Sequence, residues 1–312
     1  MKVLSTALAT FCFLGQTTAF SPIHGQSNSN SPLNPNGNAP LQPVEHAGLG
    51  QSSFASDVNA GTAGFQMFPP DNEFKIETIM GGGTVRTWKL PPWADRVQYM
   101  IMTQGRPLKA TVELWLGPLR RTHMLEMDFM DGAQTPYRAT LKFKNSTGAQ
   151  MLRIRTSEHP HLPVICGLAL PSPERAAALA ANTEAIWAEA PKQLCQGGAV
   201  QGGPGTVRTF NVPANVASVQ VLFWAVDTGK KSMKAQIEVL QGPNNPRQVI
   251  QMQCGGGSQP YHGVIQTPGD GWIIRIVNKK FVEDGLFQCA VVPYETTEQG
   301  GEGPDTQWWD IN

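Results

Sequence analysis

Two stretches of the chain contain residue types that could bind a ligand. Met80–Thr84 is rich in glycine, but it lacks a Gly-Lys-Ser/Thr ending and leads into a strand-like sequence. A phosphate-binding loop needs that ending and a helix after it, so we interpret the run as a turn. His159 and His161 can supply half of a metal site. No third ligand accompanies them in the sequence, and we expect a surface loop there.

Three acidic residues, Glu126, Asp128 and Asp131, have the close spacing of paired catalytic carboxylates. The first two alternate with Met127 and Phe129, which places the acids on the polar face of a strand. We therefore expect a solvated strand face. The sequence contains no Gly-x-Ser-x-Gly elbow and no Cys-His arrangement, so it predicts no catalytic residue, no metal site and no cofactor.

Length and charge narrow the class of protein. With 312 residues the chain is long enough for two domains that each bury a core. Its formal net charge is zero and only 15% of its residues are charged, so copies of the chain repel one another weakly. No stripe of Lys and Arg is visible, which argues against a nucleic-acid partner.

The five cysteines are too few for a disulfide framework, and no Cys-x-x-Cys pair indicates zinc. Cys12 lies in the N-terminal segment described next. We expect the other four, Cys166, Cys195, Cys254 and Cys289, to be buried free thiols.

The N-terminus has the composition of a targeting sequence. Met1-Lys2 and the apolar run Val3–Leu14 predict a signal peptide over residues 1–19, since a membrane span needs about 20 apolar residues. Residues 20–50 are rich in Ser, Asn, Pro, Gln and Gly and contain no Lys or Arg, a composition that predicts disorder. We interpret this stretch as a plastid transit segment, although plain secretion remains an alternative.

An internal repeat is the strongest signal in the sequence. Gly83–Trp88 (GTVRTW) recurs as Gly205–Phe210 (GTVRTF), a shift of 206 − 84 = 122 residues between the two threonines. Elsewhere the shift wanders between 122 and 125, as expected if loops gained or lost residues. Further matches are Lys109–Glu113 with Lys234–Glu238, Pro136-Tyr137 with Pro260-Tyr261, Leu152–Ile154 with Ile274–Ile276, and Leu168–Pro171 with Ala290–Pro293.

Each copy shows the two-residue period of strands that bury one face. Val112 and Leu114 share a face opposite Glu113, and Gly-Pro and Asp-Gly pairs supply turns every 8–12 residues. The predicted fold is all-β, with two tandem homologous antiparallel β-sandwich domains joined by a helical linker. We place the first sandwich at residues 51–171, the linker at 172–196, the second sandwich at 197–294 and a flexible tail at 295–312.

The predicted linker contains a clear helix. Ser172 can cap it, Pro173 suits its first turn, and Pro191 ends it. Ile186 and Trp187 offer an apolar contact by which the helix can dock onto a sandwich.

Candidate self-assembly residues come from the tail and from the repeat. Trp308, Trp309 and Ile311 carry large apolar side chains that are costly to leave in water, so we expect them to bury against their own domain or in a pocket of the next subunit. The repeat keeps two arginines and two glutamates in both copies: Arg86, Arg208, Glu113 and Glu238. They fit either ion pairs within a domain or contacts between copies of the chain.

The duplicated Thr-Val-Arg-Thr motif, the two Pro-Tyr pairs and the presequence Thr18–Pro22 (TAFSP) together resemble the pyrenoid shell (PyShell) proteins of diatoms and related algae. The resemblance covers roughly residues 75–295 and the tail. It implies two homologous β-domains that polymerise into a protein sheet around the Rubisco matrix, supporting CO2 fixation. It also implies import into the plastid stroma, location in the pyrenoid, and no catalytic residues.

The partners that we expect are therefore further copies of the chain and components of the Rubisco matrix, with no nucleic acid and no membrane. An alternative is a secreted carbohydrate-binding or cell-wall β-sandwich, for which Trp88, Trp93 and Trp115 are candidate sugar-stacking residues. Asn145 begins a glycosylation sequon that would be used if the chain folds in the secretory pathway.

Overall fold

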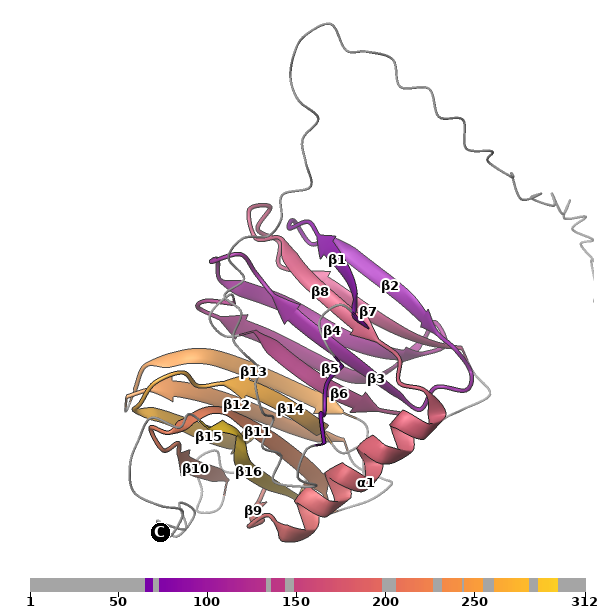
Figure 1. Ribbon diagram of the computed structural model, residues 1–312. Coiled ribbons are helices and arrows are strands. Elements are labelled where there is room, and N and C mark those ends of the chain that lie inside the picture. Colours follow the sequence, from indigo (N-terminus) through magenta and orange to yellow (C-terminus); the bar gives the residue numbers. More distant parts are fainter. Residues whose placement is uncertain are drawn as a thin grey trace, which may run out of the picture. The chain divides into compact units, whose positions relative to one another are not determined.

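A computed structural model describes residues 65–69, 73–132, 136–143, 149–197, 206–226, 232–242, 244–254, 261–280 and 286–296 (Figure 1). The predicted presequence, the tail residues 297–312 and the sequon at Asn145 lie outside the described residues. The described part is built almost entirely from β-strands, with one helix, α1 (Pro173–Glu189).

The strands form two antiparallel sheets of eight strands each. The first sheet has the order β1 (Lys75–Ile79), β8 (Val164–Ala169), β3 (Arg96–Met102), β6 (Tyr137–Lys142), β14 (Tyr261–Gln266), β11 (Val216–Ala225), β16 (Phe287–Thr296), β9 (Gln193–Cys195). The second has the order β10 (Val207–Asn211), β15 (Trp272–Asn278), β12 (Met233–Gln241), β13 (Pro246–Cys254), β5 (Arg120–Phe129), β4 (Leu108–Leu116), β7 (Gln150–Thr156), β2 (Val85–Leu90).

Both sheets are symmetric about their centres. From the middle of the first sheet outward, one half has the order β6, β3, β8, β1 and the other half has the order β14, β11, β16, β9. Each strand of one half therefore corresponds to the strand of the other half whose number differs by eight. The second sheet follows the same rule. We call β1–β8 copy one and β9–β16 copy two, because these sets contain the two copies of the sequence repeat.

The strand registers place a pseudo-twofold axis between the copies. Glu126 of β5 pairs with Gln251 of β13, and Ala139 of β6 pairs with Gly263 of β14. In each pair the two residues hold equivalent positions of the repeat, since 251 − 126 = 125 and 263 − 139 = 124. Antiparallel pairing of equivalent strands is what a twofold axis perpendicular to a sheet produces.

The all-β class, the antiparallel strands and the sandwich-like packing of the predicted fold are confirmed. The two copies share both sheets, because β5 pairs with β13 and β6 with β14. Pairing across the centre removes two strand edges in each sheet that separate sandwiches would leave open. The last residues of the predicted linker form β9, which pairs with β16 as part of copy two.

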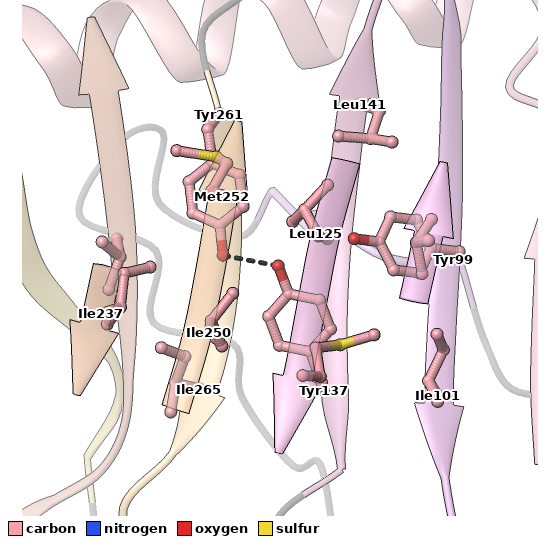
Figure 2. Packing of buried hydrophobic residues seen from close by; sticks show 14 of the residues in the cluster. Tyr99, Ile101, Leu125, Tyr137, Leu141, Ile237, Ile250, Met252, Tyr261 and Ile265 are labelled. Atoms are coloured by element: carbon pink, nitrogen blue, oxygen red, sulfur yellow. Dashed lines mark hydrogen bonds between the residues drawn. The ribbon is translucent and has the colours of Figure 1, made fainter. Parts of the chain in front are cut away.

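The core lies between the sheets and follows the predicted alternation. Val112 and Leu114 are buried while Glu113 faces outward, and in copy two Ile237 and Ile274 are buried in the same way. Residues from both sheets and both copies form one apolar cluster. Figure 2 shows its centre, where Tyr137 and Tyr261, the two Pro-Tyr tyrosines, meet through their hydroxyls at 2.5 Å.

Helix α1 runs along the outer face of the first sheet. The hydroxyl of Ser172 accepts a hydrogen bond from the Arg175 amide at 3.3 Å, so the predicted cap is confirmed. Leu179 packs against side chains of both copies, and Ile186 is buried in an apolar cluster of copy two. Trp187 stacks on Trp224 with ring centroids 5.0 Å apart, so the helix is a packed element.

One detail of the repeat alignment was wrong. Tyr99 pairs with Leu168, and its counterpart Val221 pairs with Val291. Leu168 therefore corresponds to Val291 at a shift of 123, one residue from the sequence match, and Cys166 corresponds to Cys289. Apolar runs of similar composition do not fix register to a single residue.

Over the described residues, no helix has the length and apolar character needed to cross a membrane.

Candidate functional site

The glycine run forms the turn between β1 and β2, as the sequence predicts. Gly82 and Gly83 adopt positive φ angles of 79° and 73°, and the Gly82 amide donates to the carbonyl of His159 at 3.1 Å. A Cβ atom on Gly81 would lie 2.4 Å from that same carbonyl oxygen. The glycines are therefore required by close backbone packing. His159 and His161 lie in the exposed loop that receives this turn, as expected.

The acidic residues lie on the outer face of the second sheet. Glu126 and Asp128 are exposed, and Asp128 accepts a hydrogen bond from Lys109 at 2.9 Å. They line a shallow recess of about 260 Å³ together with Gln251. Because the recess holds a lysine and an amide beside the carboxylates, we interpret it as a solvated face. In the part of the chain that the structure describes, no group of three or more His, Cys, Asp or Glu could hold a metal ion.

The repeated glutamates form ion pairs within their own copies. Glu113 lies 2.8 Å from Arg121 and 3.6 Å from Arg153, and Glu238 pairs with Arg275. Desolvation acts to raise the pKa of Glu113, but the hydrogen bonds from Arg121 and Trp115 and the charge of Arg153 outweigh it and lower the pKa. Both pairs lie on the outer face of the second sheet. A role of Glu113 and Glu238 in contacts between chains stays a prediction.

The repeated arginines lie on edge strands instead. Arg86 of β2 pairs in register with Ile154, and Arg208 of β10 with Ile276, so both side chains start on the core side of the second sheet. Arg208 donates through Nε to the carbonyl of Leu194 in β9 at 2.9 Å. It thus joins the edges of the two sheets at one end of the sandwich. Arg86 holds the equivalent position at the other end and is exposed.

The edge strands define two matched ends of the sandwich. We call β1 with β2 the first end and β9 with β10 the second end; each of these strands has a pairing partner on one side within its sheet. An edge strand presents backbone N–H and C=O groups that another strand can pair with. The Val-Arg-Thr part of the repeated motif falls on β2 and β10, so the same sequence forms the edge of the second sheet at both ends.

Of the nine large apolar side chains that are exposed among the described residues, four lie at these two ends. Ile76 of β1 is 52% exposed, Met80 just after it 63%, and Val85 of β2 37%. Val207, the counterpart of Val85 on β10, is also 37% exposed. Apolar side chains in such a group favour burial by a partner surface.

The sugar-stacking residues of the alternative function do not all face solvent. Trp88 packs against the core, with its indole Nε1 3.5 Å from Glu77. Trp93 is 51% exposed, and Trp115 donates to Glu113 at 3.0 Å on the outer face of the second sheet. The three rings therefore lie on different faces. The tail residues Trp308, Trp309 and Ile311 lie outside the described residues, and their role stays a prediction.

The described chain is thus an all-β sandwich of two halves related by a pseudo-twofold axis, with edge strands and exposed apolar residues at both ends. A comparison with protein families matches residues 70–293 to the diatom pyrenoid shell protein family. Because the match covers more than half of the 312 residues, the chain belongs to this family.

Comparison with curated proteins found no match. Among solved structures, a putative uncharacterized protein from Burkholderia cenocepacia is 12% identical, over 78% of this chain and 84% of that chain, with a TM-score of 0.20. The spike protein P1 of bacteriophage PM2 is 13% identical over 75% and 84%, with a TM-score of 0.16. Vicilin from hazelnut, Corylus avellana, is 7% identical over 72% and 86%, also with a TM-score of 0.16. Likenesses this low carry no argument about function.

Proposed function

We propose that the chain is a non-catalytic building block that joins its own copies end to end into a sheet around the Rubisco matrix of the pyrenoid. The observation that carries the proposal is the pair of matched ends, where among the described residues each edge strand pairs on one side only and Ile76, Val85 and Val207 are exposed. Family membership supports it, since the family is described as a pyrenoid shell.

Two matched ends allow a chain of contacts to grow. A contact between the first end of one chain and the second end of the next leaves one free end on each partner. Such a head-to-tail contact extends indefinitely unless its rotation closes a ring. The chain already performs a related operation internally, where two half-sandwiches join through β5 with β13 and β6 with β14.

Family membership and the N-terminal sequence both support a location in the pyrenoid of the plastid. The signal peptide and transit segment predicted for residues 1–50 would deliver the chain to the plastid stroma. There the sheet would confine the Rubisco matrix and support CO2 fixation. No cofactor is required by this role.

The test is electron microscopy of the purified chain together with variants at its ends. We expect sheets or tubes from the wild type. Val85→Lys should raise the protein concentration needed for assembly roughly tenfold or more, because a charge at a buried contact costs at least about 1.4 kcal/mol. Leu119→Lys is the matched control, since Leu119 is 91% exposed on the turn between β4 and β5. Monomers at high concentration, or equal effects of both variants, would count against end-to-end assembly.

A further inference from the structure

Cys195 and Cys289 lie side by side at the second end of the sandwich. Their Sγ atoms are 3.7 Å apart, and both side chains are fully buried. Cys195 belongs to β9 and Cys289 to β16, and these strands pair with Cys195 opposite Phe287 and Cys289 opposite Gln193. We propose that the two thiols form a reversible disulfide, by exchange with a dithiol/disulfide carrier, and that this bond fastens the edge strand β9 to β16.

The geometry lies close to that of a bond. A disulfide needs an S–S distance of about 2.05 Å, so the sulfurs must approach by about 1.7 Å. Cys289 sits on a ten-residue strand that is paired on both sides, whereas β9 has three residues and pairs with β16 alone in its sheet. The short edge strand is therefore the part that can shift to close the gap.

Copy one lacks this pair at the equivalent place. Cys166 is the counterpart of Cys289, and it lies in β8 beside the edge strand β1. The position equivalent to Cys195 is Ile79, because Ile79 pairs with Val164 as Cys195 pairs with Phe287. Both thiols donate to the carbonyl of the residue paired with them, Cys166 to Glu77 and Cys289 to Gln193, each at 3.6 Å, so the copies differ only in the second cysteine. The fastening is thus specific to the second end.

Atoms and electrons balance in an exchange between the two protein thiols and one carrier disulfide. The thiolate of Cys195 attacks a sulfur of the carrier disulfide, whose S–S bond breaks as a mixed disulfide forms and one carrier thiolate leaves. The thiolate of Cys289 then attacks the Cys195 sulfur of the mixed disulfide and releases the second carrier thiolate. The two protons lost by the cysteines end on the carrier. Two protein thiols are oxidised, and one carrier disulfide is reduced to a dithiol.

Burial makes the reaction depend on opening of the edge. The hydrogen bond with Cys195 and desolvation raise the pKa of Cys289 well above its ordinary value, so little thiolate is present while β9 is docked. Besides its backbone pairing with β16, the docked strand accepts side-chain hydrogen bonds from Arg208 at Leu194, from Asn278 at Cys195 (3.4 Å) and from the Cys289 thiol at Gln193 (3.6 Å). Local opening of β9 should therefore precede exchange, and mild denaturant should speed it.

Once formed, the bond would close a loop from Cys195 to Cys289 that contains β10 to β15. A cross-link over so long a loop restricts the unfolded chain strongly. We expect the oxidised protein to melt roughly 5–10 °C above the reduced protein, from the usual effect of a native disulfide on a chain of this size.

The test uses the full chain equilibrated with mixtures of reduced and oxidised glutathione, then acid-quenched and digested for mass spectrometry. We expect a peptide linking Cys195 to Cys289 that is lighter by two hydrogen atoms, a fall from five free thiols to 5 − 2 = 3, and the rise in melting temperature. Dithiothreitol should reverse all three. Cys254→Ser, which changes another buried cysteine, should keep the link, and Cys195→Ser should abolish both the link and the redox-dependent rise.

Three results would overturn the proposal. These are glutathione adducts without a protein cross-link, a link that involves Cys166 or Cys254, and a link that forms only after complete unfolding. The comparison of oxidised with reduced wild type does not depend on how well a serine variant folds. None of these measurements requires polymer formation, so the disulfide and the end-to-end assembly can fail separately.

Discussion

Copy one and copy two share a backbone plan but differ at matched buried positions. Their central strands meet about the pseudo-twofold axis, where Ala139 pairs with Gly263. Tyr137 and Tyr261 extend their hydroxyls toward each other beside this pair (Figure 2). A Cβ atom on Gly263 would lie 2.4 Å from the hydroxyl oxygen of Tyr261, whereas copy one carries alanine at the equivalent place. Copy two therefore has glycine where its own tyrosine lies too close for a methyl group, and copy one accommodates alanine at the matching position.

The outer covers of the copies differ more than their cores. Over copy two, α1 buries Ile186 against Leu222 and Val292. Phe74 lies next to Gly167 of copy one, in a separate cluster where Phe68 also contacts the ring of Tyr294 of copy two. The Arg175 guanidinium at the start of α1 lies 4.5 Å from the ring centroid of Phe65 and donates to the carbonyl of Gln66. The repeated strands of the two copies thus have the same arrangement, and segments outside these strands cover each copy differently.

We expect the largest loss of stability from Gly263→Ala, which places a methyl group beside Tyr261 at the pseudo-twofold axis. The new methyl group has to displace the Tyr261 ring, so we expect a loss of about 2 kcal/mol in the free energy of unfolding, measured by urea denaturation. The reciprocal change Ala139→Gly should cost at most about 1 kcal/mol, mainly through chain entropy.

A double variant, Gly263→Ala with Tyr261→Phe, removes the oxygen nearest to the new methyl group. It should recover part of the loss caused by Gly263→Ala alone. Equal stability of wild type and Gly263→Ala would show that the asymmetry at the axis is not set by the tyrosine pair.

Much of this frame could be predicted from local patterns in the sequence. The alternation around Glu113 correctly assigned Val112 and Leu114 to the buried face, and Ser172 with Pro173 correctly marked the start of the helix. The glycine run was recognised as a turn because it lacked the residues of a phosphate loop. These features depend on neighbours a few residues apart, which a sequence displays directly.

Long-range pairing could not be predicted in the same way. Alternation shows that β5 and β6 bury one face, but it does not tell whether their edges close within copy one or pair with β13 and β14. The three residues of β9 are too few for a strand signal, so the contact of Cys195 with Cys289 was also hidden. The roles of Arg86 and Arg208 became distinct from those of Glu113 and Glu238 only when the faces of the second sheet were known.

Each copy contains a buried histidine that makes the stability of the chain depend on pH. Burial lowers the pKa of His123 to about 4 and that of His262 to about 3, while an unfolded histidine titrates near 6.5. Each therefore takes up a proton on unfolding below pH 6.5. Their stabilising effect is complete above that pH and is lost as pH falls toward 4 and 3. At pH 5 we expect the loss to be roughly 2 kcal/mol per histidine.

The matched residue of the other copy provides the control. Gln248 is the counterpart of His123 at the shift of 125 and is equally buried, so His123→Gln places the residue of copy two in copy one. The free energy of unfolding of both proteins is measured by urea titration between pH 7 and pH 5. Its slope against pH should be smaller in the variant, by the equivalent of about one proton taken up on unfolding. Parallel curves would mean that the pKa of His123 is the same in the folded and the unfolded chain, so that burial does not lower it.

The ion pairs on the second sheet offer the finest comparison, and the smallest expected effect. Glu113 interacts with Arg121, Arg153 and the Trp115 indole, whereas Glu238 accepts hydrogen bonds from Arg275 and Gln236. Glu113→Gln should cost roughly 1 kcal/mol at neutral pH and Glu238→Gln roughly half as much, since partly exposed ion pairs contribute little and a network contributes more.

Pro246 holds the position in copy two that Arg121 holds in copy one, at the shift of 125, so copy two cannot form the second arginine contact. A double-mutant cycle between Glu113→Gln and Arg121→Ala, measured by urea unfolding, should therefore account for most of the difference between the two glutamates. If the coupling energy is near zero while the difference persists, the cause is the Trp115 hydrogen bond, which copy two replaces with the buried side chain of Leu240. The two results separate charge pairing from packing as the source of asymmetry on a face that the repeat otherwise keeps alike.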